Sequence, residues 1–397
     1  MFIFYLFFLL RFSGFDDEWV QVNIKDISKS ITKGTTPKNY SDHGINFIKV
    51  ESIVNNKITK IDAFIDEDTH YNELNRSILK KNDLLFSIAG SLGRTTIITD
   101  DILPANTNQA LSIIRFEKNK DLNLKFIESR LNRYDIAKYI FQNLAVGAQP
   151  NLNLQQVGKI CINLPSYSEQ NKIQSFLDYI DNKIELLEAK HKSYIGFKKY
   201  LMQQIFTQKL RFDKNCYYKN KKVKDNLIES KIEGSDNINR RLTVKLNLKG
   251  ISVRESKTTE FEGATKQFIR KSGQFIYGKQ NLHKGAFGII PKELDGYLSS
   301  SDIPSFDFIG EINPKWFYYY FSRQSFYENL ERLSTGTGSK RISPKDFLNI
   351  RIMIPDINEQ NKIVSILNNI DKKINIISNQ IVETNEFKKG LLQQMFV

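Results

Sequence analysis

The chain contains the same helix-forming segment twice. Aligned without a gap, residues 165–206 and 355–396 share 19 identities in 42 positions, and both contain the stretch EQNKI. A duplication of this length limits the fold to two related structural units within one chain of 397 residues.

Each copy predicts a long helix that packs against another helix. Both copies begin with a proline and a polar residue, followed three positions later by Glu169 or Glu359. This is the capping-box pattern, in which the polar side chain and the glutamate bond the first free amides of a helix. Apolar residues then recur at spacings of four and three over about five heptads, which predicts a coiled-coil seam. Each helix would be about 60 Å long at 1.5 Å per residue.

Two lysines, Lys198 and Lys388, fall at equivalent places on this predicted seam. A buried charge is costly, so the favoured interpretation is that both reach out to water near an end of the seam. The alternative is that they fix the register of the two helices.

About 150 residues precede each helix, which suits one domain in each place. Short apolar runs such as DLLFSIAG, ALSIIRF and FGIIP predict strands, whereas NLKFIESRLNRYDIAKYIF and PKWFYYYFSRQSFYENLERL predict helices. The expected fold class is therefore α+β, with two mixed α/β domains joined by two long helices. The predicted boundaries are 1–163 for the first domain, 164–214 for the first long helix and its connector, 215–353 for the second domain and 354–397 for the second long helix.

The charge of the chain indicates a polyanionic partner. It has 58 Lys and Arg against 44 Asp and Glu, a formal net charge of +14 and a pI of about 9.4. Nucleic acid is the partner that such a balance favours. The alternative is that the excess of lysine is compositional, because the chain is also rich in Asn and Ile.

Cysteine usage and the start of the chain bear on the compartment. Cys161 and Cys216 are single residues without CxxC spacing, which indicates the reducing cytoplasm and argues against disulfides and structural zinc. The apolar run at residues 2–10 is too short to span a bilayer, which takes about twenty residues. We expect a buried strand or a misplaced start codon there, rather than a membrane anchor.

The sequence predicts that the chain does not catalyse a reaction. GSLGRTT at residues 90–96 lacks the spacing and the lysine of a phosphate-binding loop. NPKW at residues 313–316 lacks the second proline of a DNA methyltransferase motif, and the four histidines are scattered. We therefore expect no catalytic residue and no metal site.

The remaining function is binding by two readers. Two diverged domains, each leading into its own helical arm, form an internal pseudo-dimer. DNA-binding dimers match two half-sites separated by a fixed spacing. One chain with two different readers would recognise an asymmetric, two-part sequence, with the helices acting as a ruler between its halves.

The chain resembles the specificity subunit of type I restriction-modification enzymes. The resemblance rests on LPSYSEQNKIQSFLDYIDNKIELLE with FKKYLMQQIF, on their copies IPDINEQNKIVSILNNIDKKI with FKKGLLQQMF, and on LRFSGFDDEWVQVNIKDI at residues 10–27. It covers the chain from Leu10 onward. The first ten residues depart from the polar beginning of the family.

This resemblance implies an antiparallel coiled coil that holds two target-recognition domains on double-stranded DNA. It also implies two modification (methyltransferase) subunits docked on the chain, and restriction (endonuclease and translocase) subunits that join through them. The complex would methylate adenine N6, with S-adenosylmethionine held by the modification subunit and ATP and Mg by the restriction subunit. No cofactor would bind this chain.

DNA recognition needs Lys and Arg for phosphates, and small polar or amide side chains for base edges. In the first domain we predict DNA contacts from loop residues of these types, namely Lys33, Thr35, Thr36, Lys38, Ser91, Arg94, Thr95, Asn106, Asn108, Gln109, Gln149 and Asn151. In the second domain the predicted residues are Lys279, Gln280, His283, Lys284, Ser339, Lys340 and Arg341.

Two other interpretations remain open. The predicted contact residues could belong to ordinary solvated loops, and the chain could be a coiled-coil scaffold that binds other proteins without reading DNA. The basic balance and the divergence of the two domains favour DNA.

Overall fold

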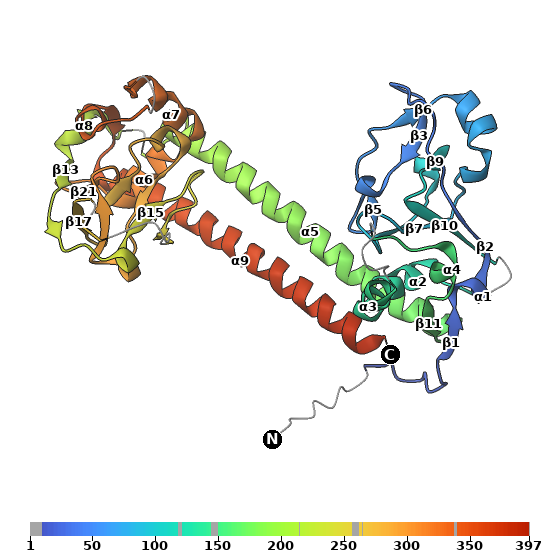
Figure 1. Ribbon diagram of the computed structural model, residues 1–397. Helices are drawn as coiled ribbons and strands as arrows, with labels where there is room; N and C mark the ends of the chain where they lie inside the picture. The colour runs from blue at the N-terminus through green and yellow to red at the C-terminus, as the bar shows by residue number, and fades with distance from the viewer. Residues whose placement is uncertain are drawn as a thin grey trace. The chain divides into compact units, whose positions relative to one another are not determined.

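The computed structural model describes residues 10–117, 121–143, 150–213, 215–255, 262–263, 265–336 and 340–396. The chain divides into two compact units, residues 1–187 with 380–397 and residues 188–379 (Figure 1). Each unit therefore contains one domain together with parts of both long helices. The predicted strand at residues 2–9 lies outside the described residues.

Both predicted long helices are confirmed, as α5 (Tyr167–Phe206) and α9 (Ile357–Met395). In the first unit Ile173 and Leu177 of α5 share one core with Leu391 of α9, and in the second Leu201 shares a core with Ile363. Ile173 and Leu177 are separated by four residues, one of the two spacings that predicted the seam.

The two helices run antiparallel within each unit. At the start of α5, Glu169 binds Arg11, whose neighbour Leu10 donates its N–H to the Gln394 carbonyl near the end of α9. Further along α5, Asp181 binds Lys388, which lies earlier in α9. In the second unit the Tyr194 ring lies beside Lys373, and Lys198, four residues later, contacts Asp371.

Both seam lysines form ion pairs with the other helix. The Lys198 Nζ lies 2.6 Å from Asp371, and Lys388 pairs with Asp181 in the equivalent way. The lysine side chains are 24% and 28% exposed, so they are neither free in water nor fully buried. Because each charge meets its partner in one alignment of the helices, the pairing supports the register interpretation over the favoured one.

The first domain consists of short strands in four sheets, with helices between them. The central sheet has the antiparallel order β2-β10-β7-β8, and a smaller sheet has the order β6-β3-β9. The strands are β1 (Val20–Asn23), β2 (Ser28–Lys33), β3 (Ile45–Ile48), β4 (Ile53–Val54), β5 (Lys57–Ile58), β6 (Phe64–Ile65), β7 (Leu84–Ser87), β8 (Thr95–Ile97), β9 (Ala105–Thr107), β10 (Leu111–Phe116) and β11 (Cys161–Leu164). The helices are α1 (Ile24–Ile27), α2 (Leu124–Leu131), α3 (Tyr134–Gln142) and α4 (Leu154–Gly158).

The second domain repeats the central sheet of the first domain with other residues. Its central sheet has the antiparallel order β13-β21-β18-β19, and its three-stranded sheet has the order β14-β17-β20. The strands are β12 (Lys219–Lys222), β13 (Leu227–Ser230), β14 (Glu233–Gly234), β15 (Leu242–Val244), β16 (Ile251–Val253), β17 (Gln267–Arg270), β18 (Phe275–Tyr277), β19 (Phe287–Ile289), β20 (Tyr297–Ser300), β21 (Ser305–Phe308) and β22 (Arg351–Ile354). The helices are α6 (Pro314–Phe321), α7 (Gln324–Asn329) and α8 (Pro344–Leu348). The duplication thus extends to the central sheet of each domain, whereas β3 pairs with β9 in parallel and β17 pairs with both of its neighbours antiparallel. The predicted α+β class is confirmed.

An aromatic pair joins each domain to the end of a long helix. In the first unit the ring of Phe396 lies 5.1 Å from Phe126 of α2. In the second, Phe206 at the end of α5 lies 6.0 Å from Trp316 of α6, the residue at the position equivalent to Phe126. All four side chains are buried.

The repeated EQN residues attach each domain to its helix. The Gln170 Nε2 donates to the Pro165 carbonyl, and its Oε1 accepts the Asn123 N–H at 2.9 Å. In the second unit Gln360 does the same with Pro355 and with the Asn313 N–H, at 2.8 Å. Because Asn123 and Asn313 cap α2 and α6, each glutamine fixes the start of a domain helix against the start of a long helix.

The predicted capping box is half correct in both helices. The polar residue caps each helix, but the glutamate does not bond back to the cap. As expected, Ser166 accepts the Glu169 N–H, and Asp356 accepts the Glu359 N–H at 2.9 Å. The glutamate side chains do not return to the cap, because the incoming chain segments cover them. Glu169 instead binds the Arg11 guanidinium at 2.7 and 2.8 Å, and Glu359 accepts the Phe212 N–H at 2.9 Å.

Candidate nucleic-acid interface

The polar loops of the first domain lie at one edge of its central sheet. At this edge β2 ends at Lys33, β7 ends at Ser87, β8 begins at Thr95 and β10 begins at Leu111. Neighbouring strands of the sheet are antiparallel, so the end of one lies beside the beginning of the next. The loops that carry most of the predicted DNA contacts therefore lie next to one another.

The loop after β2 packs directly on the turn before β10. The Thr35 N–H donates to the Thr107 carbonyl at 2.9 Å, and the Thr36 hydroxyl binds the Gln109 amide. A Cβ at Gly34 would lie 2.1 Å from the Thr107 carbonyl oxygen, so this approach requires glycine. Exposed side chains from both segments are thereby gathered in one place: Lys33, Thr35, Thr36, Lys38 and Gln109, with the half-buried Asn108 beside them.

Two further loops join the same edge. The Ile88 N–H donates to the Ala110 carbonyl at 2.8 Å, and the Leu152 N–H donates to the Ile88 carbonyl at 2.9 Å. The exposed Ser91 and Asn151 are therefore close to the turn at Gln109. We define the first edge by the exposed and half-buried residues of these loops, namely Lys33, Thr35, Thr36, Lys38, Ser91, Asn108, Gln109 and Asn151.

Three residues of this domain that were predicted to contact DNA form hydrogen bonds within the protein. Asn106 is fully buried, and its Nδ2 donates to the Leu74 carbonyl and the Ser77 hydroxyl. Thr95 is 1% exposed and accepts two side-chain amides. Their burial is at odds with the expected DNA contact, because both occupy inward positions of strands. Arg94 is exposed, but its Nη1 donates to the carbonyls of Val50 and Ile53.

The second domain has an edge of the same topology. Here β13 ends at Ser230, β18 ends at Tyr277, β19 begins at Phe287 and β21 begins at Ser305. The Ile342 N–H donates to the Lys279 carbonyl at 2.9 Å, which matches the bond from Leu152 to Ile88 in the first domain. We define the second edge by the predicted residues of these loops, namely Lys279, Gln280, His283, Lys284, Lys340 and Arg341.

Two acidic residues accompany the cations of the second edge. The Arg341 Nη1 lies 3.4 Å from Asp302, and the Lys340 Nζ lies 3.2 Å from Glu331. Both pairs are about half exposed, and such pairs contribute little to stability. Lys340 and Arg341 can therefore leave these carboxylates and bind phosphates instead. Burial lowers the pKa of His283, so its ring is neutral at pH 7 and can accept or donate one hydrogen bond. Gln149 and Ser339 lie outside the described residues.

Sequence reasoning missed Arg270, which shapes the second edge from inside. Its guanidinium is buried and donates to the carbonyls of Ser230 and Ile303 and to the hydroxyls of Ser299 and Ser305. Burial lowers its pKa to about 10, which leaves it charged at neutral pH. These bonds hold the turn that carries Asp302. An arginine in a four-residue strand gives no sequence signal that it points inward.

In the part of the chain that the structure describes, no three His, Cys, Asp or Glu side chains are grouped to hold a metal ion. Over the same residues, no helix is both long enough and apolar enough to cross a membrane.

Residues 16–194 and 202–386 match the family described as type I restriction modification DNA specificity domain. The chain belongs to this family. Each match covers one domain and most of the long helix that follows it.

The chain is also similar to individual proteins. The chain is 26% identical over 157 residues to the type I restriction enzyme EcoBI specificity subunit of Escherichia coli, which covers 39% of this chain and 31% of that protein. Sequence matches to the curated relatives span less than half of their length. The S subunit of a type I restriction-modification system from M. genitalium has a TM-score of 0.56 over 98% of both chains, at 14% identity. A chain from a type I R-M system studied for its complex assembly and conformational transition has a TM-score of 0.60 over 96% of this chain and 98% of that one, at 13% identity. These structures share the fold.

Proposed function

We propose that the chain is the non-catalytic DNA-reading subunit of a type I restriction-modification complex, with one reader in each domain. The observation that carries this proposal is the pair of sheet edges. They have the same topology and the same anchoring hydrogen bond, yet they present different side chains. A reader with two such edges suits a target whose two halves differ.

The side chains of the two edges fit the chemistry of duplex DNA. Lys33 and Lys38 in the first domain and Lys279 and Lys284 in the second suit phosphates. Amides such as Asn108 and Gln109 suit the N6 and N7 atoms of adenine, and Arg341 suits guanine or a phosphate. The net charge of +14 supports a polyanionic partner over a purely structural scaffold.

The helices offer equivalent apolar surfaces for two copies of one partner. Leu186 and Phe387 in the first unit are 72% and 56% exposed, and the equivalent Ile376 and Phe197 in the second are 56% and 50% exposed. The equivalent placement of these side chains in the two units suits docking of two copies of one modification subunit. Within the proposal, S-adenosylmethionine belongs to those subunits, ATP and Mg belong to restriction subunits, and the complex works in the cytoplasm.

The proposal is tested by coexpressing the chain with its modification subunit and sequencing N6-methyladenine across the host genome. We expect one two-part motif with a fixed spacer. Replacing Lys33 and Lys38 with alanine should weaken DNA binding on all sequences and lower the salt dependence by about one for each lost phosphate contact. Replacing Asn108 with alanine should relax one half-site, since a bidentate base contact contributes about 1–3 kcal/mol of discrimination.

Lys81→Ala is the matched control, because Lys81 is exposed, pairs with Asp100 and precedes β7 at the opposite end of that strand. Absence of a two-part motif in the methylated DNA would contradict the proposal. So would equal binding losses for Lys81→Ala and for the double Lys33→Ala/Lys38→Ala variant.

A further inference from the structure

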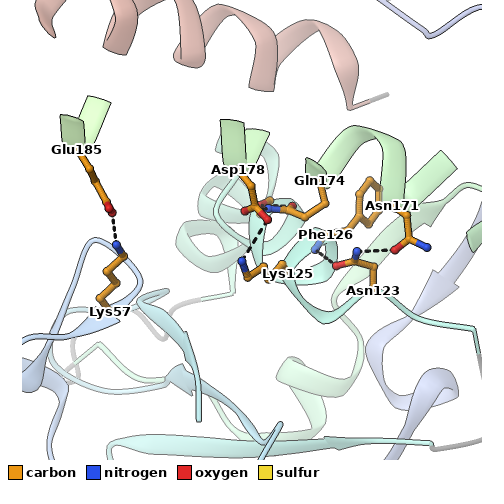
Figure 2. Close-up of polar contacts among 9 residues, drawn as sticks. Lys57, Asn123, Lys125, Phe126, Asn171, Gln174, Asp178 and Glu185 are labelled. Atoms are coloured by element: carbon orange, nitrogen blue, oxygen red, sulfur yellow. Dashed lines mark hydrogen bonds and ion pairs between the residues drawn. The ribbon is translucent and has the colours of Figure 1, made fainter. Parts of the chain in front are cut away.

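A row of polar contacts joins the first domain to one face of α5 (Figure 2). The Asn123 Nδ2 lies 2.7 Å from the Asn171 Oδ1, and the Lys125 Nζ lies 3.1 Å from the Asp178 Oδ2. The Ser129 hydroxyl lies 3.2 Å from the Gln174 Oε1, and Lys57 of the β4–β5 hairpin pairs with Glu185. We call these four contacts the clamp.

The spacing of the clamp follows the helix surface. Its α5 positions are 171, 174, 178 and 185, and separations of three, four and seven residues place side chains on one face. At 1.5 Å per residue the clamp extends over about 21 Å of the helix. The domain is therefore held at two places well separated along the helix axis.

The two ends of the clamp belong to different parts of the domain. The end at Asn171 lies beside the core that Phe126 and Ile127 of α2 share with Leu177 of α5. The far end at Glu185 meets the β4–β5 hairpin, and Ile53 of that hairpin belongs to a separate core with the start of β10. A second contact, made by a part of the domain other than α2, limits how the domain can tilt on the helix.

The far end is also connected to the first edge. Arg94, in the loop beside that edge, donates to the carbonyl of Ile53 at 2.9 Å. The hairpin that begins with Ile53 carries Lys57, which reaches Glu185. The hydrogen bond from Lys57 lowers the pKa of Glu185, so the pair stays charged at neutral pH. A continuous series of contacts thus runs from the edge loop to α5.

The second unit keeps the near end of the clamp and changes the far end. Asn313 contacts Asn361 at 2.8 Å, as Asn123 contacts Asn171. The Tyr319 hydroxyl then lies 2.9 Å from the Asn368 Oδ1 and 2.7 Å from the Asp371 Oδ2, and it can donate its one proton to the Asp371 carboxylate. The position equivalent to Glu185 is Asn375, which cannot form an ion pair. The reach of the clamp along the helix is therefore specific to the first domain.

We propose that the Lys57–Glu185 pair is a positioning contact that sets the tilt of the first reader on α5, and thereby the spacer length that the protein accepts between its two half-sites. This inference rests on the proposed function. A spacer longer or shorter by one base pair moves a half-site by about 3.4 Å and rotates it by about 34°. A reader held at both ends of the clamp resists that adjustment more than one held at the near end alone.

The test measures spacer preference with charge-reversed variants. The complex of this chain with its modification subunits is titrated with duplexes that carry both half-sites at the native spacer, one base pair shorter and one longer. Lys57→Glu and Glu185→Lys each turn attraction into repulsion. Because the pair is exposed, we expect each single variant to lower the preference for the native spacer about two- to five-fold. The double variant Lys57→Glu/Glu185→Lys should restore it.

Lys60→Glu is the control, because Lys60 follows the same hairpin and pairs with Asp62 instead of α5. It should leave spacer preference unchanged. Native preference in both single variants, or no recovery in the double variant, would overturn the inference. A changed base preference within the first half-site would also overturn it, by showing that Lys57 reads DNA. If the unmodified complex prefers no two-part site, the proposed function itself fails.

Discussion

The two EQN segments have identical sequences but different surroundings. Gln170 and Gln360 make the same two hydrogen bonds, and Asn171 and Asn361 contact the cap of the same domain helix. Glu169 binds the guanidinium of Arg11, whereas the equivalent Glu359 receives one backbone N–H from Phe212. The comparison separates what the duplication preserves, the seat of each domain on its helix, from what has diverged around it.

The sheet edges show the same division. Backbone bonds from Leu152 to Ile88 and from Ile342 to Lys279 fix equivalent loops at the same 2.9 Å. The side chains that these loops present differ, as Asn151 and Arg341 illustrate. Conserved geometry with exchanged side chains is what two readers of different half-sites require.

The largest expected effect is a loss of stability, and it tests whether each aromatic pair stabilises its own unit. Phe396→Ala should cost about 3–5 kcal/mol, because a buried ring is removed from beside Phe126 and Trp19. Hydrogen exchange should then accelerate in α2 and not in α6. Phe206→Ala should do the reverse, since its ring packs on Trp316 and Tyr320.

Phe387→Ala is the control for this comparison. Phe387 is 56% exposed on α9, so its removal should change stability by less than about 0.5 kcal/mol. If hydrogen exchange became faster in both α2 and α6 after Phe396→Ala, the two aromatic pairs would not stabilise their units independently.

The second effect is a pH dependence confined to the first unit. Burial raises the pKa of Glu128 to about 7, while hydrogen bonding to Asn56 and Thr95 opposes the rise. Between about pH 4.5 and 7 the folded state holds a proton that the unfolded state has lost, so stability falls as pH rises through this window. The loss is at most about 3 kcal/mol. The equivalent residue of the second unit is Tyr318, which does not ionise there.

Urea unfolding of the Glu128→Gln variant at pH 5 and pH 8 checks this expectation. The variant should lose that part of the pH dependence and be more stable than the parent at pH 8. A parent protein whose first unit is equally stable at both pH values would show that Glu128 is not held in a desolvated site.

The smallest effect distinguishes the two glutamates of the repeat. Glu169→Gln should cost about 1–2 kcal/mol, because it removes a buried carboxylate that accepts two hydrogen bonds from a guanidinium. Glu359→Gln should be within about 0.5 kcal/mol of neutral. The Glu359 Oε2 is buried without a hydrogen-bond partner among the described atoms. The amide of glutamine replaces this unpartnered carboxylate oxygen, and its own oxygen can still accept the Phe212 N–H. Equal losses in denaturant unfolding would contradict the comparison.

The sequence predicted the long helices well, because heptads sustained over forty residues give a strong periodic signal. It also predicted the polar caps at Ser166 and Asp356. It could not predict that Glu169 would turn to Arg11, since that partner is 158 residues away in the chain. Long-range contacts of this kind leave no local pattern.

The candidate site was predicted less completely, for a physical reason. Strands of three or four residues show too little alternation to separate inward from outward positions. Asn106 and Thr95 are polar, yet they point into the domain and bond other side chains there. Arg270 is charged, yet it is buried among serines and carbonyls. Lys33 was easier to place, because it is the last residue of β2 and is followed by a polar loop.

The central claim is that each domain reads one half of a two-part target, and an exchange of one domain tests it most directly. Residues 215–353 are replaced by the corresponding segment of another family member, and the chimera is expressed with its modification subunit. Sequencing of N6-methyladenine across the genome should then show one half of the motif changed, with the other half retained. A motif in which both halves change, or neither does, would contradict the account.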